Sequence, residues 1–137
     1  YPYWAQYAQF SPKDLRLSLV TGIHYGYAVP TAGELALADE SDQANFEELT
    51  KLCDAQKVSI VLSIGGPGAE DALRETASSD DKLAAFSKSI VSWMNKYNLS
   101  GIEIDWQNPQ PNDMDGLEKL VAAARSGMDE EFEGAEL

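Results

Sequence analysis

Three apolar stretches alternate with amphipathic helical segments along this chain, at intervals of about 40 residues. The apolar stretches, residues 19–29, 58–64 and 101–106, are rich in Val, Ile, Leu and Tyr and are typical of buried strands. Between and after them, apolar residues recur three and four positions apart, as on one face of a helix. Strands joined by helices in this way build parallel sheets. The sequence therefore predicts an α/β fold.

Helix caps and chain breaks divide the chain further. Ser11 followed by Pro12 is a typical helix start, and residues 31–40 are expected to form a loop. Gly65-Gly66-Pro67-Gly68 is a strong break that ends the second strand. Asn112 or Asp113 is expected to cap the last helix. We expect the acidic tail, residues 129–137, to be frayed.

The charge balance excludes several classes of function. Acidic residues outnumber basic ones 23 to 10 among 137 residues, a formal net charge of −13. Such a chain repels phosphate backbones and anionic lipid surfaces, so we expect neither a nucleic-acid nor a membrane partner. Cys53 is the only cysteine and is expected to be a buried small apolar residue. His24 is the only histidine and lies in an apolar, aromatic run, so we expect no metal site and no catalytic role for it.

The third strand carries a polar side chain at every second position. Glu103, Asp105 and Gln107 alternate with Ile102, Ile104 and Trp106. Positions two apart in a strand point the same way and lie about 6.6 Å apart. The carboxyl end of a parallel strand is where α/β folds place their sites. The alternation therefore predicts a functional row of side chains at this end of the sheet.

A solvated edge strand is the alternative interpretation of this row. Gly101, which permits close packing, and the amphipathic helices on either side of the strand favour the functional interpretation. Glu103 and Asp105 would then be neighbours of like charge, so we expect one of the two to have a raised pKa.

Four segments together resemble glycoside hydrolase family 18, the chitinases and their lectin-like relatives. Residues 100–107 resemble its Asp-Gly-x-Asp-x-Asp-x-Glu signature, and residues 63–66, Ser-Ile-Gly-Gly, resemble its Ser-x-Gly-Gly strand end. Residues 23–28 are similar to its second strand, and residues 1–4 to the segment after its first strand begins. The four segments follow the order of the family and cover nearly the whole chain.

The resemblance implies an eight-stranded parallel (β/α)8 TIM barrel. Residues 1–137 would be a partial catalytic-type domain of this family, the N-terminal half of the barrel with about its first four βα units. A closed barrel takes about 250 residues. We therefore expect a fragment, a chain of which only part is seen, or a half that pairs with the missing second half of the barrel.

The family cleaves β-1,4-linked N-acetylglucosamine polymers with retention, using the 2-acetamido group of the substrate as the nucleophile. The resemblance thus implies chitin or its oligosaccharides as partners, no cofactor and no metal. Because family members are mostly secreted, it also implies an extracellular location, although no signal peptide pattern opens this chain.

Seven positions take roles from the resemblance. Gln107 stands where the family has the glutamate that protonates the leaving oxygen, and Asp105 where an aspartate orients the acetamido group. Glu103 stands at the inner aspartate beneath it, and Ser63 matches a hydroxyl that supports the carboxylate pair. The implied aromatic walls for sugar rings are Tyr27, Tyr3 and Trp4.

The signature departs from the family pattern at three of its four acids. Ser100 replaces the first aspartate, and Glu103 replaces the second with a longer side chain. Gln107 matters most, because an amide is not a general acid near neutral pH. We therefore expect a domain that binds chitin-type glycans better than it cleaves them.

Two origins of Gln107 remain open: natural divergence towards a lectin-like relative, or a Glu-to-Gln change in an otherwise active retaining chitinase. A third interpretation, from another class, is a structural or partner-binding scaffold without sugar affinity.

Overall fold

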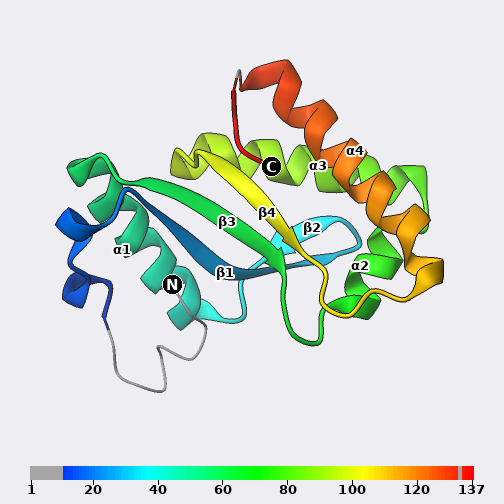
Figure 1. Cartoon of the computed structure of the whole chain (residues 1–137), viewed down its shortest axis with the longest axis horizontal. Coiled ribbons are helices and arrows are strands. Elements are labelled where there is room, and N and C mark those ends of the chain that lie inside the picture. Colours follow the sequence, from blue (N-terminus) through cyan, green and yellow to red (C-terminus); the bar gives the residue numbers. More distant parts are fainter. Residues whose placement is uncertain (1–10, 133) are drawn as a thin grey trace.

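The computed structural model describes residues 11–132 and 134–137. Tyr3 and Trp4, two of the expected aromatic walls, lie outside the described residues. The elements in chain order are η2 (Pro12–Asp14), η3 (Leu17–Leu19), β1 (Gly22–Thr31), β2 (Glu34–Ala36), α1 (Glu40–Gln56), β3 (Ser59–Gly65), α2 (Glu70–Thr76), α3 (Asp80–Tyr97), β4 (Gly101–Asp105), η4 (Pro111–Asp113) and α4 (Met114–Glu131) (Figure 1).

Three parallel strands and one antiparallel edge strand form a four-stranded sheet. The strand order is β2-β1-β3-β4, in which β1 pairs with β3 and β3 with β4 in parallel. The α/β prediction and the parallel pairing are therefore confirmed. Residues 31–40, which we expected to be a loop, are a correction: they contain β2, which pairs antiparallel with the end of β1. Ala32 and Gly33, both with positive φ, make the tight turn between the two strands.

Helices α1 to α4 share one core with one face of the sheet. Tyr25 of β1, Leu62 of β3 and Ile102 of β4 are buried in the same apolar cluster as residues of all four helices. Figure 1 shows α3 and α4 running side by side next to β4. Since alternate residues point to opposite faces, the next positions along the strands, such as Ser63 and Glu103, lie on the face away from this core. Among the described residues, no helix has the length and apolarity needed to cross a bilayer.

The expected caps are present with one exception. Ser11 accepts a hydrogen bond from the Lys13 N–H at the start of η2, and Ser79 accepts one from Lys82 at the start of α3. Asp113 is a correction, because its side chain does not cap α4. Its carboxylate instead accepts the backbone N–H of Gln110, one turn earlier.

The acidic tail, which we expected to be frayed, returns to the sheet. Helix α4 continues to Glu131, and Glu136 then forms a parallel bridge with Gly101 at the start of β4. The Ile102 N–H donates to the Glu136 carbonyl at 3.0 Å, and the Glu136 N–H donates to the Ser100 carbonyl at 3.1 Å. The tail thus lies beside β4 on the side away from β3, where the next parallel strand of a βα barrel would begin.

Candidate functional site

The pairing of β3 with β4 brings the predicted polar residues to one end of the sheet. In the parallel register Ser63 lies opposite Glu103, and Gly65 lies opposite Asp105. The hydroxyl of Ser63 donates a short hydrogen bond to Glu103 Oε2. Ser63 is 3% exposed, so the buried hydroxyl finds its partner in this carboxylate. The two residues that the resemblance placed together are therefore in contact.

His24 joins this pair from β1, and the sequence did not indicate it. Its Nδ1–H donates to Glu103 Oε2 at 3.1 Å, across the intervening strand β3. Gly26 pairs with Ser63 and carries no side chain, which leaves space between β1 and β4 at this level. The signal that could have found His24 is its place two residues before Gly26, on the same face of β1.

Two hydrogen bonds lower the pKa of the Glu103 carboxyl. The Ser63 hydroxyl first, and the His24 imidazole second, lower the pKa of the Glu103 carboxyl below its ordinary value, because both stabilise the charged form. We expected one acid of the row to have a raised pKa through repulsion between Glu103 and Asp105. For Glu103 the structure shows the opposite, since its hydrogen-bond partners outweigh the effect of burial.

Asp105 faces Gln107 instead. The Gln107 side-chain Nε2–H donates to Asp105 Oδ2 at 3.1 Å. Both side chains are half-buried just beyond the carboxyl end of β4. An amide can donate this bond at any pH, whereas a glutamate in its place could donate only when protonated. The glutamine therefore donates to the aspartate but has no proton that it can give away.

A glycine turn ties the end of β3 to the end of β4. The Gly66 N–H donates to the Asp105 carbonyl at 2.9 Å. Gly65 has a φ of +118°, and a methyl group there would lie 2.3 Å from the same carbonyl oxygen. The Tyr27 ring packs on Gly66, where an added methyl group would lie 2.6 Å from the ring. Only glycines allow the Asp105 backbone and the Tyr27 ring to approach the turn this closely.

A cavity of about 380 Å³ opens beside this turn. Tyr27, one of the aromatic residues that the resemblance singled out, forms part of its wall, together with the hairpin β1–β2 and the start of α1. Its described lining is mainly apolar, and Asp42 is the one charged residue in that lining: Tyr27, Val29, Thr31, Ala36, Leu37, Ala38, Asp42, Gly65 and Pro67. An apolar wall with a few polar groups is common in pockets that bind small molecules.

Within residues 11–132 and 134–137, no group of three His, Cys, Asp or Glu side chains is arranged to hold a metal ion.

Removing the Ser63 hydroxyl should raise the pKa of Glu103. The lowered pKa means that Glu103 stabilises the fold above the pKa of an unfolded Glu, about 4.3. That contribution disappears as the pH falls through the folded-state value. In Ser63→Ala this contribution is smaller, so the variant should lose less stability between pH 6 and pH 3 than the parent, pH values chosen to bracket about 4.3. A ¹³C NMR titration of the Glu103 carboxyl measures the pKa directly. Ser92→Ala, on the exposed face of α3, is the control and should leave the titration unchanged.

The fold and the polar row place the chain in one class of protein. The family model described as glycosyl hydrolases family 18 matches residues 1–136. The chain therefore belongs to glycoside hydrolase family 18.

Chitinases and a chitinase-like protein are among its relatives. A class V chitinase of Medicago truncatula is 27% identical over 134 residues, covering 94% of this chain and 35% of that protein. A chitinase-like effector of Moniliophthora perniciosa is 26% identical over 103 residues, covering 73% of this chain and 23% of that protein. The chain thus spans about a third or less of these two relatives.

Solved chitinases have the same fold over this region. A double mutant of a family 18 chitinase from Cycas revoluta, in complex with (GlcNAc)4, superposes with a TM-score of 0.84 at 25% identity, covering 96% of this chain and 40% of that chain. The group IV chitinase of Ostrinia furnacalis superposes with a TM-score of 0.83 at 20% identity, covering 98% and 40%. These neighbours confirm the TIM-barrel class, and the described chain forms part of such a barrel.

Proposed function

We propose that this chain is part of a chitinase-family barrel that binds β-1,4-linked N-acetylglucosamine polymers and hydrolyses them poorly or not at all. The contact between Gln107 and Asp105 carries the proposal. By the resemblance Gln107 stands where the family has its general acid, and its amide, which donates to Asp105, has no proton to give at neutral pH. Around it, Ser63, Glu103 and Asp105 keep the hydrogen-bonded arrangement of a polar site.

Two similar proteins bear on this proposal. The Cycas revoluta mutant in complex with (GlcNAc)4 includes a glutamate-to-glutamine change. The Moniliophthora perniciosa relative is described as chitinase-like. A family 18 protein with a glutamine in place of a glutamate can therefore hold a chitin oligosaccharide.

An active retaining chitinase is the second candidate, with Gln107 as a replacement for glutamate. Two hydrogen bonds that hold the row in place favour it. The buried Ser63 hydroxyl donates to Glu103, and the glycine turn donates to the Asp105 carbonyl. These contacts would hold the row in place for catalysis if a glutamate stood at position 107. The scaffold interpretation, in contrast, predicts no affinity for sugar at all.

Calorimetric titration of the complete protein with N-acetylglucosamine tetramer tests binding. We expect measurable affinity for this tetramer and much weaker affinity for cellotetraose, which lacks the acetamido groups. Tyr27→Ala should weaken binding by about threefold to tenfold, the effect of losing one aromatic contact, and Tyr27→Phe should bind like the parent. Equal affinity for both sugars would contradict the proposal, and no affinity for either would contradict it and favour a scaffold.

A further inference from the structure

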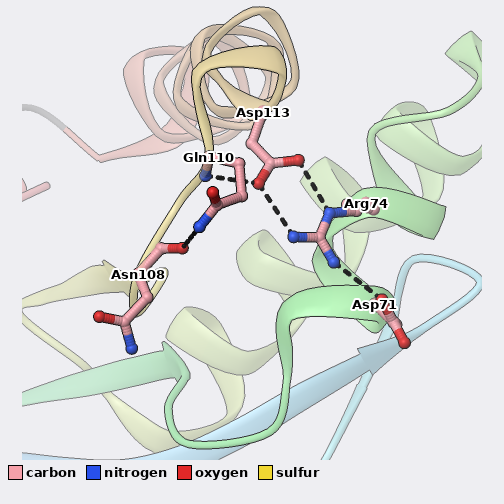
Figure 2. Close-up of polar contacts among 5 residues, drawn as sticks. All are labelled: Asp71, Arg74, Asn108, Gln110 and Asp113. Atoms are coloured by element: carbon pink, nitrogen blue, oxygen red, sulfur yellow. Dashed lines mark hydrogen bonds and ion pairs between the residues drawn. The ribbon is translucent and has the colours of Figure 1, made fainter.

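Arg74 of α2 forms an ion pair with Asp113, in the segment that follows β4. Its Nε–H and Nη2–H donate to the two carboxylate oxygens of Asp113, at 2.8 and 2.9 Å. Its third nitrogen, Nη1, donates to Asp71 at 2.8 Å. Figure 2 shows the guanidinium of Arg74 between the two aspartates. Asp113 is only 5% exposed, whereas the Asp71 side chain is 98% exposed. The contact with Asp113 is therefore the one shielded from water.

Asp113 also forms a hydrogen bond with the loop before η4, so its contact with Arg74 anchors that loop. Its Oδ2 also accepts the Gln110 N–H at 2.8 Å, and the Gln110 side chain donates to the Asn108 carbonyl at 3.1 Å (Figure 2). Asn108 has a φ of +50°, a conformation that needs support from its surroundings. Arg74 and the Gln110 N–H together lower the pKa of Asp113, so the carboxylate stays charged.

The anchored loop is the one that carries Gln107. At its start, the Asp105 carbonyl accepts the Gly66 N–H, and at its end Asp113 is held by Arg74. Gln107 lies between these two fixed points. Arg74 also stands over the ring of the neighbouring Trp106, with its Cζ 6.0 Å from the ring centroid.

The placement of Arg74 links two site segments. Helix α2 begins directly after the glycine turn at the end of β3, and η4 directly precedes α4, at the end of the loop from β4. Arg74 thus joins the segments that follow the two strands bearing Ser63 and Asp105. An Arg–carboxylate fork fixes direction as well as distance, which a lysine does not.

We propose that Arg74 is a positioning residue, which fixes the loop of residues 106–113 so that the Gln107 amide faces Asp105. The inference deepens the proposed function, and the part of its test that measures sugar affinity rests on that function. An amide turned away from Asp105 also loses the geometry of any hydrogen bond to a bound sugar, and such a loss weakens binding. Loss of the fork should therefore change sugar affinity as well as stability.

The direct test follows the Gln107 side-chain amide by ¹H–¹⁵N NMR in the complete protein. We expect Arg74→Gln to shift or broaden the two N–H signals of the Gln107 side chain. Arg74→Lys should do so less, because lysine keeps the charge without the fork. Asp71→Asn removes only the exposed partner of Arg74 and should leave the signals in place. Unmoved Gln107 signals in folded Arg74→Gln would overturn the proposal. If Arg74→Gln fails to fold, Arg74→Lys decides in the same way.

Sugar affinity gives the second readout. For the N-acetylglucosamine tetramer we expect about tenfold weaker binding or more in Arg74→Gln, and parent-like binding in Asp71→Asn. A lower melting temperature with unchanged affinity would reduce Arg74 to a purely structural role and contradict the proposal. A parent protein that binds no tetramer contradicts the proposed function instead, and the NMR signals of Gln107 still decide whether Arg74 positions it.

Discussion

Gln107→Glu is expected to raise the rate of hydrolysis of N-acetylglucosamine oligosaccharides by about 10²–10⁴-fold. The substitution changes only the amide nitrogen of Gln107 into an oxygen, at a position whose side chain already contacts Asp105. A glutamate there lies beside a second carboxylate, and repulsion between them keeps a proton on the pair at higher pH. That shared proton is what a general acid needs. Release of reducing sugar from the tetramer, followed over several pH values, measures the gain.

A matched control has to change the charge by the same amount elsewhere. Gln56→Glu does so at the exposed end of α1, next to the start of β3 and so at the opposite end of the strands from the row. It should leave the rate at the parent level. If Gln107→Glu is as slow as Gln56→Glu, the other residues of the site are not competent and the active-chitinase candidate fails. A large gain would instead show that Gln107 alone separates this chain from an enzyme.

The row on β4 shows how far sequence can predict such a site. The period of two in residues 103–107 gave both the face and the end of the sheet, because side-chain direction in a strand depends only on position. The contact between Ser63 and Glu103 was implied by the family resemblance, which placed the Ser63 hydroxyl against the carboxylate pair. In the structure the two residues lie opposite each other in the parallel register of β3 and β4.

Contacts between distant segments were beyond that reasoning. His24 reaches Glu103 from 79 positions away, and only the register of β1 and the missing side chain at Gly26 make the contact possible. The Arg74–Asp113 fork joins residues 39 positions apart whose spacing has no period. Strand β2 was missed for a different reason: its three residues are too few for an alternation to be recognised.

The lowered pKa of Glu103 could not be predicted for the same reason. Like charges two positions apart were visible in the sequence, whereas the donors that lower the pKa of Glu103 come from β1 and β3. In the structure Asp105 contacts Gln107, and Glu103 contacts Ser63 and His24. The row is therefore divided into two separate groups of contacts, one around Glu103 and one around Asp105.

Gly65→Ala is expected to damage the site more than any other single methyl group added to the glycine turn. Gly65 has a φ of +118°, which costs an alanine about 1–3 kcal/mol of backbone strain. The added methyl group would also lie 2.3 Å from the Asp105 carbonyl oxygen and 3.0 Å from the Asp105 carbonyl carbon. The ends of β3 and β4 must then separate, which breaks the Gly66–Asp105 hydrogen bond. We therefore expect the free energy of unfolding to fall by about 3 kcal/mol or more.

Gly68→Ala separates the two causes, because Gly68 lies in the same turn with a φ of +82° but has no atom within 4 Å of an added methyl group. It should lose only the backbone cost of about 1–2 kcal/mol and keep the affinity of the parent for N-acetylglucosamine tetramer. Gly65→Ala should lose both stability and affinity, since Asp105 moves with the end of β4. Denaturant unfolding and calorimetric titration of both variants measure the two effects. Equal losses in the two variants would mean that backbone strain alone acts here, and that the approach of Gly65 to Asp105 does not hold the site together.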